Sequence, residues 1–250
     1  MVFLWFILLP TISMADQLEP RGKVLKFDGD VEVVDSMGEK RAVKNIEEPL
    51  NEMDTIVTKK DASVVLRFND GALSVLGEKS RLRVKKTSWF SYLGGKVYFT
   101  FKKVFGEQQR VVKTRSATIG IRGTTFIISE NTDQDGEAVA LKEGLLQIES
   151  TGPAFEIHKK KLLDEFEQFK LKQQREKRQL QDEFQRYKEN NIKEFIEYRH
   201  RFTLQPNRVI NLSGYRVDEA EMTAVNQADF ESFEEEAEDF INEFREKSKN

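Results

Sequence analysis

The side chains that most often carry catalysis or bind metals are scarce in this chain. Its 250 residues include no cysteine and only two histidines, His158 and His200, which lie far apart and outside any His-Glu-x-x-His pattern. Thiol chemistry is therefore excluded, and a zinc site has no ligand pattern to support it. No Gly-x-Ser-x-Gly sequence marks a nucleophilic serine. We expect no catalytic residue, metal or cofactor, although an enzyme that uses only carboxylates would leave no such pattern.

Two loops resemble ligand-binding loops only superficially. In residues 71–80, Glu78 separates Gly77 from Lys79, and its carboxylate would repel the phosphate that a phosphate-binding loop holds. Residues 133–137 contain oxygen side chains but lack the ligand spacing of an EF-hand calcium loop. The net charge of −3 argues against nucleic acid as a partner. Residues 133–137 are therefore expected to form a solvated hairpin turn, and no phosphate loop is expected at residues 71–80.

The most distinctive stretch is residues 111–128, in which β-branched residues alternate with small ones, as is typical of strands. Within it, Gly120 and Gly123 bracket Arg122. Because glycine accepts positive φ and close backbone contact, this Gly-Ile-Arg-Gly sequence predicts a tight corner between strands. Arg122 would then donate hydrogen bonds to carbonyls that the corner buries. The alternative interpretation is a loop that binds an anion or another ligand.

The N-terminal residues indicate export. Residues 2–9 are apolar, and Ser13 and Ala15 place small side chains where signal peptidase cleaves, so residues 1–15 are expected to be a signal peptide. The apolar run is too short to span a bilayer. No cysteine is available to carry a lipid anchor. We therefore expect a protein that is periplasmic or secreted, with an earlier start codon left open.

Residues 16–155 are expected to form an all-β domain. Short runs of alternating apolar and polar residues follow one another, separated by polar turns. Asp28-Gly29 and Asp70-Gly71 each separate two such runs, which predicts a hairpin at each pair. Stacked strands of a β-roll or solenoid would produce this repeating pattern of short strands and turns, and so would a sandwich. Both architectures stay open.

Residues 22–150 resemble the FecR domain, the periplasmic part of ferric-citrate-type regulators that also occurs in stand-alone exported proteins. The specific part of the resemblance is the string Ala-Thr-x-Gly-x-Arg-Gly-Thr-x-Phe at residues 117–126, and weaker matches occur in family order on both sides of it. We interpret the motif positions as structural; they are Thr118, Gly120, Arg122, Gly123, Thr124, Phe126, Asp70 and Gly71.

The resemblance implies an extracytoplasmic binding domain. Family members that signal across the inner membrane resemble anti-sigma proteins, with a cytoplasmic segment and a transmembrane helix before this domain. Here only a signal peptide is expected there, so contact with a sigma factor is not carried over. We expect a non-enzymatic binding or scaffold protein that contacts another envelope protein or a cell-wall component. The alternative is a periplasmic sensor that relays a ligand or transporter state to a membrane partner.

The C-terminal part is expected to be helical, which makes the fold class multidomain α and β. Apolar side chains recur by threes and fours in residues 156–203, which predicts a long amphipathic helix. Residues 204–217 are interpreted as a linker, and residues 218–248 as an acidic amphipathic helix. Because the first helix is more basic, a helical hairpin or coiled coil is expected. Homo-oligomerisation through the helices is an alternative.

Overall fold

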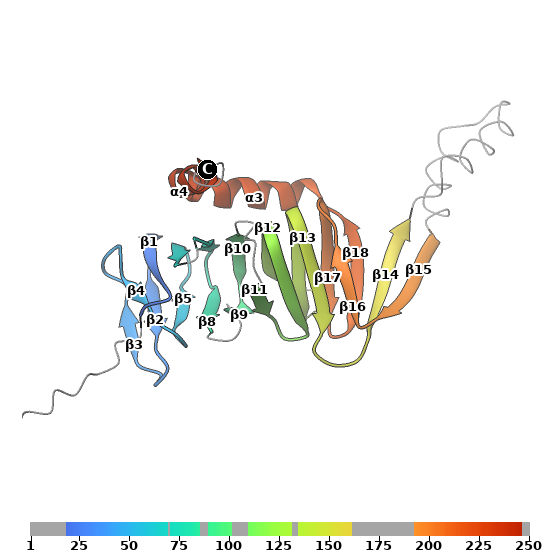
Figure 1. Ribbon diagram of the computed structural model, residues 1–250, viewed down its shortest axis with the longest axis horizontal. Helices are drawn as coiled ribbons and strands as arrows, with labels where there is room; N and C mark the ends of the chain where they lie inside the picture. The colour runs from blue at the N-terminus through green and yellow to red at the C-terminus, as the bar shows by residue number, and fades with distance from the viewer. Residues whose placement is uncertain are drawn as a thin grey trace, which may run out of the picture.

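The molecule is an elongated stack of strands with two helices along one side (Figure 1). The structure is a computed structural model and describes residues 19–69, 71–85, 90–101, 110–131, 135–161 and 193–246. The expected signal peptide lies outside these residues. Within the described part, no helix is both long and apolar enough to cross a membrane.

The elements follow the labels of Figure 1. The strands before the long central hairpin are β1 (Gly22–Asp28), β2 (Val31–Val34), β3 (Lys40–Ala42), β4 (Pro49–Leu50), β5 (Thr55–Thr58), β6 (Ser63–Phe68), β7 (Leu73–Leu76), β8 (Arg81–Val84), β9 (Phe90–Gly94), β10 (Lys96–Thr100) and β11 (Arg110–Lys113). The remaining elements are β12 (Ala117–Asn131), β13 (Gly136–Ser150), β14 (Phe155–Lys161), β15 (Lys193–Arg199), β16 (Arg201–Leu204), β17 (Arg208–Ser213), β18 (Arg216–Glu221), α3 (Ala224–Glu236) and α4 (Glu238–Glu246).

The strands form two sheets that face each other. In the first sheet, hydrogen-bonded neighbours follow the order β4–β1–β6–β7–β10–β12–β13–β17–β18–β14–β15. In the second sheet the order is β3–β2–β5–β8–β9–β11–β12–β13–β16. These pairs are antiparallel except for β9–β11 and β14–β18, which are parallel.

The β12–β13 hairpin belongs to both sheets because each of its strands is 15 residues long. The second half of β12 pairs with β10, and the first half pairs with β11. Likewise, β13 pairs with β17 near its start and with β16 near its end. The register between β12 and β13 shifts between Arg122 and Phe126. There the hairpin bends from one sheet into the other, as bulged strands do at the corners of sandwiches.

One apolar core fills the space between the two sheets. Successive side chains of a strand point to opposite faces, so Val64 and Leu66 of β6 face this core while Val65 faces the other side. Aromatic rings fill its centre, with the ring centroids of Phe99 and Phe126 5.1 Å apart. Full burial of each such side chain contributes about 1.5–3 kcal/mol. This shared core makes the two sheets one packed unit.

The expected all-β region is confirmed, and it combines the two architectures left open. The sheets face each other as in a sandwich, while the chain passes repeatedly between them as in a roll. The hairpin predicted at Asp28-Gly29 is wrong, because β1 and β2 lie in different sheets. Gly29 has a φ of +68°, and a Cβ there would lie 2.8 Å from the carbonyl oxygen of Asp61. Gly29 therefore lies where the chain crosses from the first sheet to the second.

The long helix expected over residues 156–203 is wrong at both of its ends. Residues 155–161 form β14, and residues 193–204 form β15 and β16. Residues 162–192, the middle of that expected helix, lie outside the described residues. The linker expected at residues 204–217 is also wrong, because it contains β17 and the start of β18.

Pairing between distant parts of the sequence explains this error. β14 pairs in parallel with β18 and antiparallel with β15, and such tertiary pairing overrides the helix propensity of Lys- and Glu-rich segments. The apolar stripe also did not mark one buried face, since Phe202 is buried while Tyr198 is 69% exposed. A long helical hairpin or coiled coil is therefore not supported.

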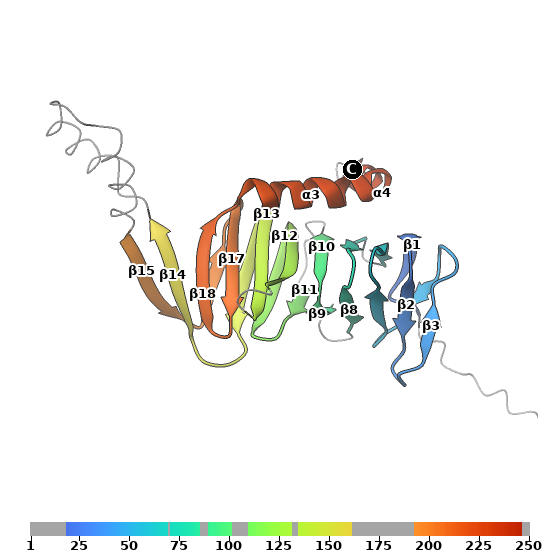
Figure 2. The same cartoon turned by 180° about the vertical axis from the view of Figure 1, so that it is seen from behind.

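The expected acidic helix at residues 218–248 is partly wrong, because this segment begins with the rest of β18 and then forms α3 and α4. Thr223 starts α3 with a capping box: its hydroxyl accepts the Asn226 N–H, and the Asn226 side chain accepts the Thr223 N–H. The helices pack against the first sheet and run along the stack (Figure 2).

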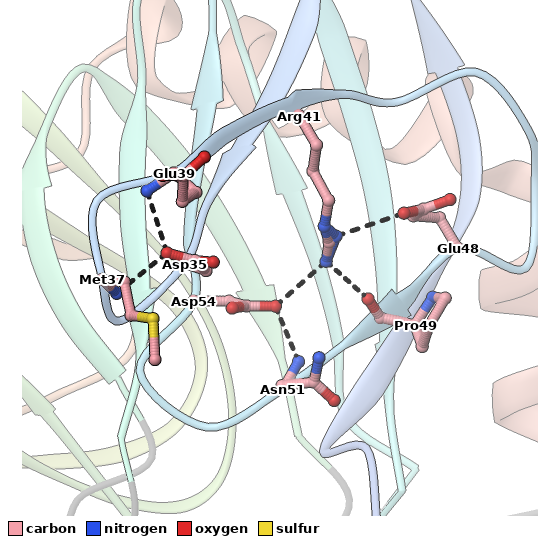
Figure 3. Close-up of polar contacts among 8 residues, drawn as sticks. All are labelled: Asp35, Met37, Glu39, Arg41, Glu48, Pro49, Asn51 and Asp54. Atoms are coloured by element: carbon pink, nitrogen blue, oxygen red, sulfur yellow. Dashed lines mark hydrogen bonds and ion pairs between the residues drawn. The ribbon is translucent and has the colours of Figure 1, made fainter.

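At the N-terminal end, a polar cluster fastens the outermost strands (Figure 3). Arg41 of β3 donates hydrogen bonds to the Glu48 carboxylate at 3.2 Å and to the Pro49 carbonyl oxygen of β4 at 3.0 Å. It also donates to Asp54 Oδ2 at 3.1 Å, and Asp54 accepts the Asn51 N–H at 2.8 Å. Asp54 is 2% exposed. This single arginine therefore links edge strands of both sheets.

Candidate functional site

The motif on β12 builds the bend between the sheets. Gly123 has a φ of +61° and Gly144 on β13 has a φ of +86°, a region that residues with a side chain rarely adopt. A Cβ on Gly144 would lie 2.3 Å from the Gly123 carbonyl oxygen. The predicted corner is therefore a bulged bend within one strand. Positive φ requires glycine at positions 123 and 144, and close contact also leaves no room for a side chain at position 144.

Other motif side chains pack into the core. Phe126 is fully buried and stacks on Phe99 and Phe101. Thr124 is buried as well, and its Oγ1 has no hydrogen-bond partner in the described part of the chain. Gly120 is buried and lies opposite Val111 of β11. These positions serve the fold rather than a reaction.

Arg122 is exposed, contrary to the expectation that it would serve buried carbonyls. No hydrogen bond or ion pair joins its guanidinium to another residue of the described ranges. Its neighbour across the hairpin, Leu145, is 46% exposed. Thr118 lies four residues earlier on the same strand and so shares the outer face of the second sheet with Arg122. Thr118 and Arg122 are thus the motif side chains that a partner could contact.

The second part of the motif, Asp70-Gly71, falls between β6 and β7 in the sequence. Asp70 is outside the described residues, and Gly71 lies in the turn. Gly71 has a φ of +84°, and its N–H donates to the Phe68 carbonyl oxygen at 2.8 Å. β10 separates this turn from the β12 bend, because it pairs with β7 on one side and with β12 on the other. The two parts of the motif are therefore separate turns along the first sheet.

The outer face of the first sheet is covered by α3 and α4. Phe230 and Phe233 of α3 pack against Tyr98 of β10, with ring centroids 6.2 and 6.0 Å from that of Tyr98. Three ion pairs frame this contact, each at 2.7 Å: Lys96–Asp229, Lys142–Glu234 and Arg67–Glu243. The acidic residues of the helices therefore pair with basic residues of the strands, and not with a second long helix as expected.

Sequence reasoning missed a polar cluster on β14. His158 is buried, and its Nε2 lies 2.7 Å from Glu156 Oε1. In the sheet register, His158 faces Asp218 of β18 and Ile196 of β15. The alternation of residues 155–159 was the signal that could have revealed this strand. Nevertheless, no group of His, Cys, Asp or Glu side chains suited to a metal ion occurs among the residues that the structure describes.

Two titratable groups with shifted pKa values have structural roles. Burial raises the pKa of Tyr92, and the carboxylates of Glu130 and Glu137 raise it further. The neutral Tyr92 hydroxyl donates to the Gly95 carbonyl oxygen at 2.7 Å. The pKa of Glu78 is lowered because its carboxylate accepts the Asp61 N–H, with Lys79 adding to the effect. A lowered pKa keeps Glu78 charged, and this charge would repel a phosphate bound at residues 71–80.

Comparison with known proteins supports the family resemblance. Residues 54–147 match the family model described as FecR protein. No curated protein matches the sequence. Among solved structures, a cell surface anchoring domain is 30% identical over 27% of this chain and 87% of its own length, with a TM-score of 0.26.

Two crystal structures of an anti-sigma factor candidate from Parabacteroides distasonis ATCC 8503 are also similar. Each is 13% identical, and the match covers 68% of this chain and 60% of that protein, with TM-scores of 0.44 and 0.42. The matched family region begins at Asp54, which Arg41 anchors, and includes the β12–β13 bend. Residues 54–147 of this chain are therefore the part that matches the FecR family.

Proposed function

We propose that this chain is an exported, non-enzymatic binding protein of the cell envelope that uses its FecR domain to hold another protein. The family match over residues 54–147 carries the proposal. The division of labour within the motif supports it. The bend requires Gly123, and the core buries Thr124 and Phe126. Arg122 instead faces solvent without a partner among the described residues.

The contact surface in this proposal is the outer face of the second sheet. Arg122, Lys113 and Arg81 are exposed there, and Leu93 and Leu145 add apolar surface. The opposite outer face, that of the first sheet, is already covered by the chain's own acidic helices. A partner with an acidic and partly apolar surface would complement the second sheet.

Site-specific cross-linking tests this proposal, because the chain has no cysteine and each introduced one is unique. An Arg122→Cys variant carrying a photoreactive cross-linker should capture a defined envelope protein in cells. Met37→Cys is the matched control, since Met37 is 89% exposed and lies on the turn after β2. Equal capture at both positions, or no capture at Arg122→Cys, would contradict the proposed surface.

A regulatory version of this role is the second candidate, and the FecR match itself favours it. In that case the bound protein would be a transporter or sensor whose state the chain relays to a membrane partner. Transcription in a deletion strain should then change, and an Arg122→Glu variant should fail to restore it. Unchanged transcription after deletion would leave the binding role alone in place.

A further inference from the structure

The C-terminal end of the first sheet presents an open strand edge. β15 pairs along its whole length with β14, from Lys193 opposite Lys161 to Arg199 opposite Phe155, without a register shift. In the described part of the chain, β15 pairs only with β14, so its other side has no strand partner among those residues. The backbone N–H and C=O groups on that side can therefore template another strand.

Apolar side chains gather at this end. Ile196 is 49% exposed and Tyr198 is 69% exposed, and both lie on the same face of β15. Tyr215, 40% exposed, follows β17 and accepts the Glu156 N–H through its carbonyl oxygen. A long, regular and partly apolar edge without a bulge or proline is a feature that natural sheets normally avoid when the edge stays in water.

We propose that β15 pairs antiparallel with β15 of a second copy of this chain, joining two first sheets into one continuous sheet. The exposed apolar side chains favour a copy of the same strand, because Ile196 and Tyr198 of one copy can lie opposite Tyr198 and Ile196 of the other. This inference goes beyond the proposed envelope contact and does not depend on it.

Symmetry limits the possible registers. With a twofold axis perpendicular to the sheet, facing side chains stay on the same face, so a residue on β15 must lie opposite itself or a residue an even number of positions away. Placing Ile196 opposite itself would set Lys193 against Arg199 twice, and like charges in such pairs are destabilising. Placing Glu197 opposite itself sets Ile196 against Tyr198 twice, which pairs the two exposed apolar side chains.

The existing ion pairs make the second register acceptable. Glu197 Oε2 lies 2.9 Å from Arg199 Nε and 3.6 Å from Lys159 Nζ, so each copy of Glu197 brings its own compensating charges to the axis. A single strand edge is a small interface, and small interfaces give weak, reversible association. The dimer should therefore form in a concentration-dependent way.

Two measurements on the purified full chain test this proposal. Sedimentation velocity over a wide concentration range should show a monomer–dimer equilibrium, which an Ile196→Lys/Tyr198→Lys variant should weaken by roughly tenfold or more. Val225→Lys is the matched control, because Val225 is 71% exposed but lies on α3. A monomer at every concentration, or a dimer that the double variant leaves unchanged, would overturn the proposal.

Disulfide trapping tests the register. Under mild oxidation, Glu197→Cys should form a covalent dimer faster than Ile196→Cys, while Val225→Cys should stay monomeric. Faster trapping at Ile196→Cys would reject this register, and equal trapping at all three positions would show random collision. If the β15 amides were protected from hydrogen exchange in a strictly monomeric protein, another segment of the same chain would cover the edge and the proposal would fail.

Discussion

The N-terminal end of the stack finishes with β3 and β4, which are three and two residues long, whereas the C-terminal end finishes with β15, which is seven residues long. Pro49 in β4 lacks a backbone N–H, and its carbonyl oxygen is taken by Arg41 (Figure 3). The guanidinium is in turn held by Asp54. No comparable polar cluster holds β15 among the described residues.

This difference shows two ways of treating an open sheet edge. Short strands, proline and charged side chains block pairing with another chain. The N-terminal end has all three, and it therefore stands as a terminus of the fold. The C-terminal end has charged side chains too, but its strand is neither short nor interrupted by proline, and it carries Ile196 and Tyr198 in solvent. Its regular edge is better explained as a surface that meets another strand than as a terminus.

The largest expected loss of stability comes from Asp54→Ala, which breaks the polar cluster around Arg41 at the N-terminal end. This change removes the carboxylate that holds Arg41 and leaves the Asn51 N–H without its acceptor. Because Asp54 is almost fully buried, the free energy of unfolding should fall by about 3 kcal/mol. Chemical denaturation of the purified protein measures it.

The control for this change is Asp61→Asn, since the Asp61 side chain is 79% exposed and forms only a surface pair with Lys60, and asparagine tolerates the φ of +53° at this position. Its unfolding free energy should change by less than about 0.5 kcal/mol. Equal losses for the two variants would mean that Arg41 does not fasten this end. Association through β15 should be the same in both, because neither change touches the other end.

The second prediction concerns the bend midway between the two ends. Gly123→Val places a β-branched side chain at a φ of +61°, which should destabilise the protein by about 2 kcal/mol or more. Thr124→Val is the matched control, because it introduces the same residue one position later and removes a buried hydroxyl that has no hydrogen-bond partner in the described part of the chain. Its melting temperature should stay unchanged or rise. A normal melting temperature for Gly123→Val would contradict the role of the bend.

The sequence-based predictions held where the determining signals are local. Alternating runs and turn glycines predicted an all-β region, and the φ of +84° at Gly71 agrees with the predicted turn. The same kind of signal misled at Asp28-Gly29, since a turn residue does not say whether the chain returns to the same sheet or crosses to the other. Local sequence signals therefore predicted where strands and turns occur, but not which sheet each strand joins.

The C-terminal part failed because its structure depends on distant partners. β14 is held by β18, more than fifty residues later, and although the alternation of residues 155–159 indicates a strand, no local feature identifies its partner. The motif was recognised from the sequence, yet its division into structural and exposed positions was not. Arg122 was expected inside the corner, but it still follows the alternation of the first half of β12, opposite Leu145, and the register shifts only after it. Alternation predicts which residues share a face, but it does not show where a bulge begins.

A smaller effect should follow from Arg41→Lys. The arginine reaches three oxygens on Glu48, Pro49 and Asp54 with one planar group, whereas an ammonium cannot reproduce this fork. Unfolding free energy should fall by about 1 kcal/mol, less than for Asp54→Ala, because the charge opposite Asp54 is kept. Thermal unfolding of the two variants side by side checks this order. A larger loss for Arg41→Lys would mean that the Pro49 carbonyl contact dominates this edge.

The smallest expected effect contrasts the buried Asp54 with an exposed carboxylate in the same half of the molecule. The pKa of Glu78 is lowered from 4.5, chiefly because its carboxylate accepts the Asp61 N–H. A lowered pKa in the folded state means that the stabilisation is present above the unfolded value and is lost as the pH falls through the folded value. Glu78→Gln should therefore melt slightly below the parent protein near neutral pH and together with it well below pH 4.5. A gap that persists in acid would show that the hydrogen bond matters independently of the charge, and a gap as large as that of Asp54→Ala would remove the distinction between exposed and buried anchors.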